Sequence, residues 1–446
     1  MTVVRANADV VIAGGGPAAA AAAISLASSG IDTLLLVSPR HTLKMAEAIP
    51  AAALSLFEAL GLTDLIRRIG TVVRGVENRW DLENPVTRGD SFVVVDRAEF
   101  ARRMLGAAIS RGASVEAVSS RPALIFRADR IAVEISGRTR EFDCAIDATG
   151  RAAIWSSPVQ RMGRMIAGVF EAPPLKSLAG LKLVRTGHGW AYLIGRQNYT
   201  TVGMISPRHQ SDQFPEQVAD ELGTLLRNMH SVGRRPATVQ WARSPIRDRV
   251  IAVGDAALAH DPISGQGIRF ALASAIAAAA VIRTWRRFPF DRKTPADFYT
   301  DFVTTERERH LRFLQSFYGE QLVDGIGHTI ETSQAAAVSN SIAQHSELGA
   351  KLYFSGHIES APLHLNGYIE RGETLRGPDN RAFRWLGGFD LLRLRDLARD
   401  PVTIASLIQM LILEGLDADR AAVIINWCVV NRILGIAASR RRPPAD

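Results

Sequence analysis

The sequence has 446 residues, of which 47% are hydrophobic and 22% charged, with 36 glycines, 20 prolines and 2 cysteines. This length and apolar content exclude a disordered, collagen-like or coiled-coil chain and provide for two or three domains with a sizeable core. The net charge of +8 is spread along the chain, which favours a solvated basic surface over a nucleic-acid-binding protein, with an anionic cofactor or an acidic polypeptide partner as the alternative.

The cysteines, apolar runs and histidines indicate the cell compartment, the absence of membrane association and the absence of a metal site that we expect. Cys144 and Cys428 cannot build a disulfide framework, which favours a reducing cytoplasm. We expect no membrane association, because Arg269 interrupts the apolar stretch at 267–282 and the first residues lack the layout of a signal peptide. The 10 histidines are scattered without metal-ligand spacing, so no metal site is expected.

The chain opens with the pattern of a βαβ unit. Residues 8–13 form a buried strand, 18–28 an alanine-rich helix and 33–37 a second buried strand. Between the first strand and the helix lies a G-x-G-x-x-A turn composed of Gly14, Gly15, Gly16, Pro17, Ala18 and Ala19. Gly14 permits the tight turn, Gly16 lets a pyrophosphate approach the backbone, and Ala19 allows close packing. The turn predicts that the helix N-terminus binds phosphate groups.

The acidic residue that normally ends the second strand and binds a ribose is replaced. Ser38 stands there, followed by Arg40, and we expect both to lie near the nucleotide.

The remaining elements suggest three parts. We predict helices at 54–69, 97–111, 216–230 and 267–287, strands within 72–96, 142–148, 164–243 and 250–253, and an almost entirely helical chain beyond 295. The fold class is thus α/β. A Rossmann-like nucleotide-binding domain is formed by 1–72, 97–163 and 244–290, a mixed β-sheet substrate domain by 73–96 and 164–243, and a helical C-terminal domain by 291–446.

A second glycine-containing region follows the strand at 250–253. Asp255, after Gly254, is placed to accept a hydrogen bond from a cofactor hydroxyl at the carboxyl end of the sheet. The loop that follows contains Asp261, Pro262, Gly265, Gln266, Gly267 and Ile268. Its glycines open a long helix, whose N-terminus would stabilise negative charge on the same cofactor. His260, beside Asp261, is a candidate for moving a proton, although a solvated loop histidine explains it as well.

These motifs together resemble those of a known family. Arg97-Ala98-Glu99-Phe100 and Asp147-Ala148-Thr149-Gly150-Arg151 lie between the two glycine regions, in the order seen in FAD-dependent monooxygenases. The segment 44–50 is similar to the K-x-G-E-x-[IL]-P loop of the branch that contains flavin-dependent halogenases and geranylgeranyl reductases, with Ala46 replacing the glycine. The resemblance implies that Lys44, Arg97, Asp255 and the backbone of 265–268 contact FAD, that Glu47 lies beside the flavin ring, and that 190–192 (Trp-Ala-Tyr) wall a substrate pocket.

Departures from the family narrow the expected reaction. The halogenases' lysine and W-x-W-x-I-P motif have no counterpart, which disfavours halogenation. The D-G-x-x-S motif of simple aromatic hydroxylases is replaced by 147–151, so the docking of NADH or NADPH as electron donor, directly or through a reductase, has no recognisable motif.

The C-terminal segment 387–435 predicts three short helices, as in a winged-helix module. Thr403 and Asp417 are expected N-caps, and Gly415 is expected to end the middle helix. Two acidic residues at 417 and 419 would repel phosphate, so peptide docking or plain structural packing is favoured over nucleic acid.

The resemblance extends to flavoproteins of tryptophylquinone cofactor biogenesis, including its tryptophan-hydroxylating monooxygenases. It implies an enzyme that uses FAD to hydroxylate an electron-rich aromatic ring through a flavin C4a-hydroperoxide. The expected substrate is a tryptophan of a precursor polypeptide, with maturation-complex proteins as further partners. Glu47, His260 and Asp261 are the candidate catalytic residues. A flavin-dependent reductase of isoprenoid double bonds and a non-catalytic maturation partner remain as alternatives.

Overall fold

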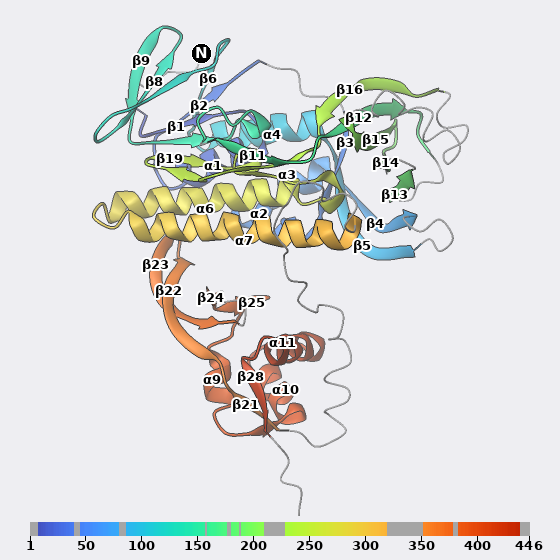
Figure 1. Cartoon of the computed structure of the whole chain (residues 1–446), viewed down its shortest axis with the longest axis vertical. Helices are drawn as coiled ribbons and strands as arrows, with labels where there is room; N and C mark the ends of the chain where they lie inside the picture. The colour runs from blue at the N-terminus through green and yellow to red at the C-terminus, as the bar shows by residue number, and fades with distance from the viewer. Residues whose placement is uncertain are drawn as a thin grey trace, which may run out of the picture. The chain divides into compact units, whose positions relative to one another are not determined.

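The computed structural model describes residues 8–39, 45–79, 86–156, 158–175, 180–186, 189–208, 228–318, 351–377 and 382–437 (Figure 1). The chain divides into two compact units, Met1–Gly327 with Asn366–Tyr368, and His328–Leu365 with Ile369–Asp446. The predicted nucleotide-binding and β-sheet domains both fall in the first unit. Helix α7 (Lys293–Tyr318), which we predicted to open the C-terminal domain, instead packs along α6 (Gly267–Arg287) in the first unit.

The first unit is built on a six-stranded sheet in the order β18-β19-β10-β1-β2-β6. Its strands are β18 (Ile246–Arg247), β19 (Val250–Ala252), β10 (Cys144–Asp147), β1 (Val10–Ala13), β2 (Thr33–Val37) and β6 (Ser114–Ala117). All pairs from β19 to β6 are parallel, so the carboxyl ends of these strands meet at one edge. The βαβ unit predicted from the first residues, with α1 at Pro17–Ala27, is confirmed. It brings the glycine turn to that edge.

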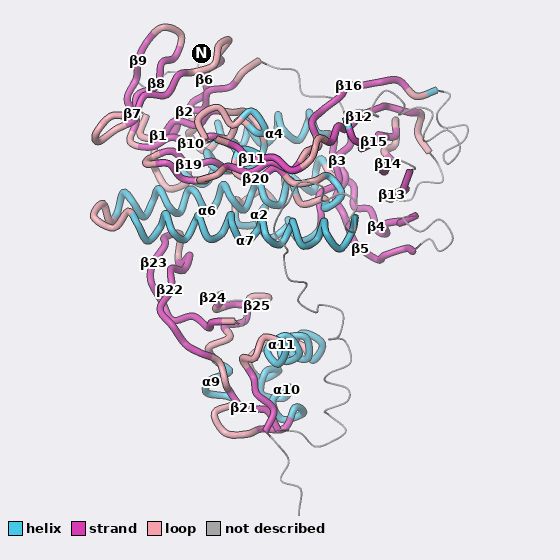
Figure 2. The backbone as a smooth tube through the Cα atoms, in the orientation of Figure 1, coloured by secondary structure: helices cyan, strands magenta, loops and turns pink. Residues whose placement is uncertain are grey.

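Small side chains let the helices approach this sheet closely. Helix α1 packs against α6 and against α4 (Arg97–Ser110), and its residues from Ala18 to Ala23 are buried. Figure 2 shows α6 and α7 running side by side. The predicted helix at 54–69 is wrong as a single element. It forms α2 (Leu54–Ala59) and α3 (Thr63–Ile69), because Gly61 between them adopts a φ of 65°, outside the helical range.

Helix α6 also has the length and apolarity of a membrane-spanning segment. It is the one such helix among the described residues, and 72% of its most apolar window is buried inside the protein. A buried core helix passes the same test of length and apolarity, so α6 is weak evidence for a membrane span.

An eight-stranded sheet stands beside the nucleotide-binding sheet, in the order β16-β12-β15-β14-β13-β4-β5-β3. Its strands are β16 (His230–Pro236), β12 (Met165–Ala172), β15 (Thr200–Pro207), β14 (Gly189–Gly195), β13 (Leu181–Thr186), β4 (Thr71–Arg79), β5 (Val86–Asp96) and β3 (Ala46–Pro50). The segment expected as a loop near the flavin is therefore a strand at 46–50, paired antiparallel with β5. The helix predicted at 216–230 lies largely outside the described residues, and at its end His230 opens β16 instead.

Two smaller antiparallel sheets complete the first unit. One is the meander β7 (Ala123–Phe126), β8 (Ile131–Ile135) and β9 (Arg138–Phe142), whose apolar face joins the core beneath the six-stranded sheet. The other contains β11 (Val159–Met162), β17 (Val239–Ala242) and β20 (Leu258–Ala259).

The second unit mixes strands and helices, so the prediction of an almost entirely helical chain beyond 295 is wrong. Its strands are β21 (Lys351–Phe354), β22 (His357–Leu365), β23 (Tyr368–Arg376), β24 (Ala382–Phe383), β25 (Trp385–Leu386), β26 (Phe389–Asp390), β27 (Val402–Thr403) and β28 (Leu434–Ala437). The core of this unit includes apolar side chains from these strands, among them Leu352, Leu375 and Leu434, and the sequence interpretation overlooked the strands.

The expected helices of the second unit are confirmed. They are α9 (Arg393–Leu397), α10 (Ile404–Leu413) and α11 (Ala418–Val430). The side chains of Thr403 and Asp417 accept hydrogen bonds from the backbone N–H groups of Ser406 and Arg420, as N-caps do. Gly415 follows α10 with a φ of 93°. The sheet β27-β21-β28 belongs to the same unit, an arrangement of strands and helices like that of a winged-helix module.

Candidate cofactor-binding and active site

The glycine turn after β1 has the shape that a pyrophosphate needs. Gly14 has a φ of 129°, and an added Cβ would lie 2.3 Å from the carbonyl oxygen of Ala148. At Gly16 an added Cβ would meet nothing within 4 Å, so the backbone there faces open space. Helix α1 begins at Pro17 without a side-chain cap, which leaves its first N–H groups for a ligand. These observations fit a phosphate-bearing cofactor.

The second glycine region lies directly against the first. Gly254 has a φ of 57°, and an added Cβ would lie 2.9 Å from the Cβ of Ala18. The N–H of Gly254 also donates to Oγ of Ser274, 2.9 Å away on α6. This close packing places Asp255, in the short 3-10 helix Gly254–Ala256, beside the N-terminus of α1. The two motifs therefore form one cradle, as the sequence predicted.

Arg97 and Glu47 form an ion pair at the side of this cradle. Arg97 opens α4, and its Nη1 donates to Oε2 of Glu47 at 3.0 Å. The pairing of β3 with β5 sets this contact, because it places Glu47 opposite Val95. The charge of Glu47 raises the pKa of Arg97, and smaller effects of Asp255 and Tyr192 add to it against burial. Arg97 is thus a fixed cation between the cradle and the eight-stranded sheet.

The eight-stranded sheet also carries Tyr192 and a second arginine, Arg235. Together with the Arg97–Glu47 pair, these residues form the wall of the site. Tyr192 lies opposite Gly203 of β15, where an added Cβ would come 2.1 Å from the tyrosine ring, so the ring lies across a strand without a side chain. Burial, followed by the charge of Glu47, raises the pKa of Tyr192 to about 12, which keeps the phenol neutral. Burial, then the charge of Arg97, lowers the pKa of Arg235 on β16, and the charge of Glu47 opposes this shift.

The sequence interpretation named Tyr192 but missed Arg235. A lone arginine in a strand carries no motif, and only the order of the strands brings it to this wall.

Trp190 precedes Tyr192 by two residues on the same face of β14. Their ring centroids are 5.9 Å apart, and Trp190 is 1% exposed. Trp190 is therefore a core aromatic, and the expectation that 190–192 wall a substrate pocket stays a prediction for Tyr192.

Asp261 is buried, and it organises the loop before α6. Its Oδ1 accepts hydrogen bonds from the N–H of Ile263 at 2.9 Å and from the hydroxyl of Tyr318 at 3.2 Å. Its own N–H donates to Nε2 of His310 at 2.9 Å. Burial raises the pKa of Asp261 to about 6, so its carboxyl can exchange a proton near neutral pH. Tyr318 and His310 lie on α7 and were not predicted.

The glycines of this loop open toward free space. Gly265 adopts a φ of 60°, and added Cβ atoms at Gly265 and Gly267 would meet nothing within 4 Å. Gln266, which precedes α6, provides no side-chain cap. Pro262 opens the 3-10 helix Pro262–Ser264, and Ile268 is buried. The loop and the uncapped helix N-terminus fit the flavin end of a cofactor.

His260 is buried rather than solvated, with 6% of its surface exposed. Its ring centroid lies 4.6 Å from that of His310, and its Nδ1 has no hydrogen-bond partner. Burial, then the charges of His310, Arg269 and Arg151, lower its pKa well below the ordinary value. The imidazole is therefore uncharged at neutral pH, so it can accept a proton there only with difficulty.

The motif at 147–151 connects the cradle to the sheets. The carboxylate of Asp147 accepts hydrogen bonds from the backbone and hydroxyl groups of Thr149 and Ser156 and from the N–H of Trp155. Arg151 donates to the carbonyl oxygens of Thr238 and His260 and lies 3.7 Å from Asp255. Asp147 is thus a structural anchor, whereas Arg151 joins the site.

The remaining predicted contacts are at the nucleotide end. Ser38 is exposed immediately after β2, next to Val37, which an added Cβ at Gly15 would touch. Arg40 and Lys44 lie outside the described residues.

Comparisons with known proteins identify an FAD-binding domain and relate the fold to solved structures. Residues 7–148 match a family model described as an FAD binding domain. No curated protein sequence matches the chain. The solved structure of the peptidyl tryptophan dihydroxylase QhpG, essential for tryptophylquinone cofactor biogenesis, is similar with a TM-score of 0.67 and 21% identity, over 95% of this chain and 99% of that one.

Two halogenases are similar as well. CmlS, a flavin-dependent halogenase, has a TM-score of 0.73 and 20% identity over 98% of both chains. The myxobacterial chondrochloren halogenase CndH has a TM-score of 0.61 and 21% identity over 70% of this chain and 82% of that one. The predicted α/β fold is confirmed: residues 7–148 form an FAD-binding domain, and the chain has the fold of these flavin-dependent enzymes.

Proposed function

We propose that this flavin-dependent oxidoreductase is an FAD-dependent monooxygenase that hydroxylates an electron-rich aromatic ring. The observation that carries the proposal is the junction of the glycine cradle with the wall formed by Tyr192, Arg235 and the Arg97–Glu47 pair. The proposed substrate is a tryptophan side chain of a precursor polypeptide, during tryptophylquinone cofactor biogenesis. The likeness to QhpG over almost the whole length of both chains supports this substrate.

The cradle residues would bind and orient FAD. The N-terminus of α1 would hold the pyrophosphate, Asp255 a hydroxyl of the cofactor, and the N-terminus of α6 the flavin ring. The chemistry that FAD supplies when bound is the activation of dioxygen. The positive end of α6 would stabilise negative charge on the reduced ring, which is an electrostatic contribution made by the backbone.

The side chains of the wall would handle charge and protons. Tyr192 stays neutral and can donate a hydrogen bond through its hydroxyl group. Glu47, held by Arg97, offers a carboxylate oxygen that can accept a proton from the reacting ring. Asp261, with a pKa of about 6, can hold or release a proton at its carboxyl. His260 is a weaker candidate because it is buried and uncharged.

We propose NADH or NADPH as the electron donor, directly or through a reductase, and the second unit as a docking module for the polypeptide. Halogenation is not proposed, because the lysine and W-x-W-x-I-P motif of the halogenases are absent from the sequence. No specific observation favours the reduction of isoprenoid double bonds.

The function can be tested by product mass. The FAD-loaded protein, NADH and a flavin reductase are incubated in air with a library of tryptophan-containing peptides, and in parallel under heavy-isotope dioxygen. We expect a mass gain of one or two oxygen atoms on tryptophan, with the heavy isotope incorporated. Added hydrogen in place of oxygen would identify a reductase. Hydrogen peroxide release that no peptide alters, without any modified product, would contradict the monooxygenase.

A further inference from the structure

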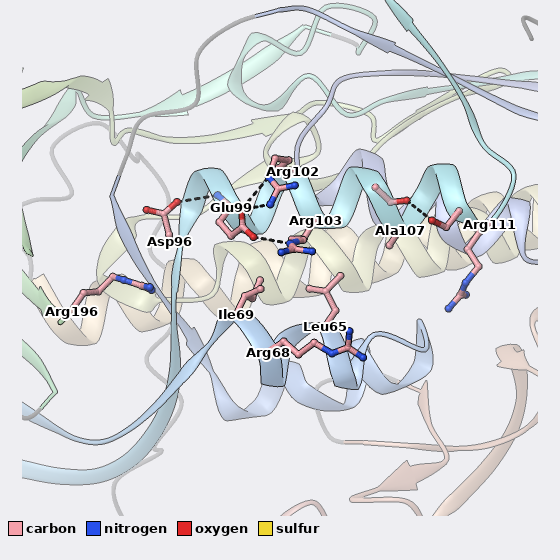
Figure 3. Close-up of a pocket in the computed structure, with 12 residues that line it drawn as sticks. Leu65, Arg68, Ile69, Asp96, Glu99, Arg102, Arg103, Ala107, Arg111 and Arg196 are labelled. Atoms are coloured by element: carbon pink, nitrogen blue, oxygen red, sulfur yellow. Dashed lines mark hydrogen bonds and ion pairs between the residues drawn. The ribbon is translucent and has the colours of Figure 1, made fainter. Parts of the chain in front are cut away.

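An arginine-rich groove lies on the surface of the first unit, between α3 and α4 (Figure 3). It has a volume of about 870 Å³ and is open to solvent. Its charged lining consists of Arg68, Arg102, Arg103, Arg111, Arg196, Asp96 and Glu99. Leu65, Ile69 and Ala107 supply apolar surface between the charges. The five arginines and two carboxylates give the groove a net charge of +3.

Both carboxylates are already used inside the protein. Glu99 accepts hydrogen bonds from Arg103 at 2.6 Å and from Arg102 at 3.0 Å, and these bonds lower its pKa. Asp96 caps α4 by accepting from the N–H of Glu99 at 2.9 Å, and it accepts from the hydroxyl of Tyr199 at 2.9 Å. Glu99 therefore fixes two guanidinium groups in place, and the positive charge that remains faces the groove.

The dimensions of the groove suit an extended chain. Its lining residues follow one face of α4, whose 14 residues correspond to about 21 Å of helix. An extended peptide covers this distance with about six residues. Figure 3 shows Arg196 at one end and Arg111 at the other. Arg196 comes directly after β14, the strand that carries Trp190 and Tyr192.

We infer that this groove docks an acidic segment of the polypeptide partner, with carboxylates on the arginine rim and apolar side chains on Leu65 and Ile69. The inference rests on the proposed function only in taking the partner to be the polypeptide substrate. The groove lining contains no aromatic ring on which a nucleobase or nicotinamide would stack. The groove is also separate from the FAD cradle, since Arg97 points to Glu47 while its neighbour Asp96 lines the groove.

The test measures binding without turnover. The probe is a fluorescein-labelled peptide of about eight residues that alternates glutamate with leucine, added to the FAD-loaded protein and followed by fluorescence anisotropy. We expect saturable binding that weakens as salt rises, and no binding of the same peptide with glutamine in place of glutamate. The double variant Arg68→Glu/Arg196→Glu should bind the peptide more weakly, with a dissociation constant raised by about tenfold or more.

The matched control is Arg138→Glu/Arg312→Glu, which makes the same charge change at two exposed arginines outside the groove. Its affinity should stay near that of the unaltered protein. If both double variants lose the same peptide affinity, the loss follows from net charge, and docking in the groove is contradicted. Displacement of the peptide by NADPH or by a short single-stranded DNA would reassign the groove to those ligands. Peptide binding with no oxygenated product would leave this inference standing and count against the proposed function instead.

Discussion

The two sides of the candidate site differ in the atoms that form them: one is backbone and the other is side chains. The cradle around Gly14, Gly16 and Gly254 is made of backbone. An added Cβ would clash with neighbouring atoms at Gly14 and Gly254, and it would enter open space at Gly16. The opposite wall, with Glu47, Tyr192 and Arg235, is made of long side chains carried by three strands. Backbone sites are sensitive to any side-chain atom, whereas side-chain sites are sensitive to charge. Substitutions in the two regions should therefore separate binding from chemistry.

The largest effect is expected at Gly14. Gly14→Ala places a Cβ 2.3 Å from the Ala148 carbonyl oxygen at a φ of 129°. We expect a loss of unfolding free energy of about 4 kcal/mol or more and loss of bound FAD. Denaturant unfolding and the visible spectrum measure both.

Gly16→Ala is the matched control. Its Cβ enters open space and Gly16 has a φ of −85°, so the apoprotein should keep its stability while FAD affinity falls. Equal destabilisation by both alanines would show that steric contact does not shape the cradle.

Asp261 should make stability depend on pH. Its pKa is raised to about 6 from 3.8, so the folded state favours the protonated form. Relative to the unfolded chain, this effect stabilises the folded protein fully at pH values below 3.8, the pKa of Asp261 in the unfolded chain. The stabilisation is lost as the pH rises through about 6, and the free energy of unfolding then falls by about 3 kcal/mol. Asp261→Asn cannot ionise and should gain stability relative to the unaltered protein as the pH rises from about 4 to about 7.

The opposing titration of His310, whose pKa burial lowers to about 4, is present in both proteins and cancels in the comparison. A constant stability difference across this pH range would contradict the raised pKa.

Glu47 tests the chemistry of the wall. Glu47→Gln removes the negative charge beside Arg97 but retains the shape, and its side chain is 24% exposed. We expect turnover to fall about 100-fold if the carboxylate accepts a proton, with a stability change below about 1 kcal/mol. The FAD spectrum and Tm should be unchanged. Full activity of this variant would exclude Glu47 as the base.

Substitutions of His310 test how α7 supports the loop before α6, and they have the smallest expected effect on stability. His310→Leu leaves the buried N–H of Asp261 without an acceptor, which costs about 1–2 kcal/mol of unfolding free energy. His310→Gln supplies an amide oxygen and should restore part of that energy together with the flavin spectrum. Equal losses in both variants would assign the effect to packing rather than to the hydrogen bond.

Local patterns in the sequence determined much of the cradle. The βαβ unit, the turn at 14–19, the helix at 267–287 and the caps Thr403 and Asp417 all appear where predicted. Steric and capping interactions of this kind act within a few residues, so the residues that cause them are neighbours in the chain.

The tertiary structure alone decided the wall and its supports. Arg235, His310 and Tyr318 reach the site through strand order and through the packing of α7, which leave no motif in a single sequence. The strand at 46–50 forms because β5 pairs with it, and the strands between 351 and 390 have partners that local pattern does not identify. Burial then raises the pKa of Asp261 and lowers that of His260. Pairing and burial depend on residues far apart in the chain, so the protonation states at this site follow from the fold and not from the motifs.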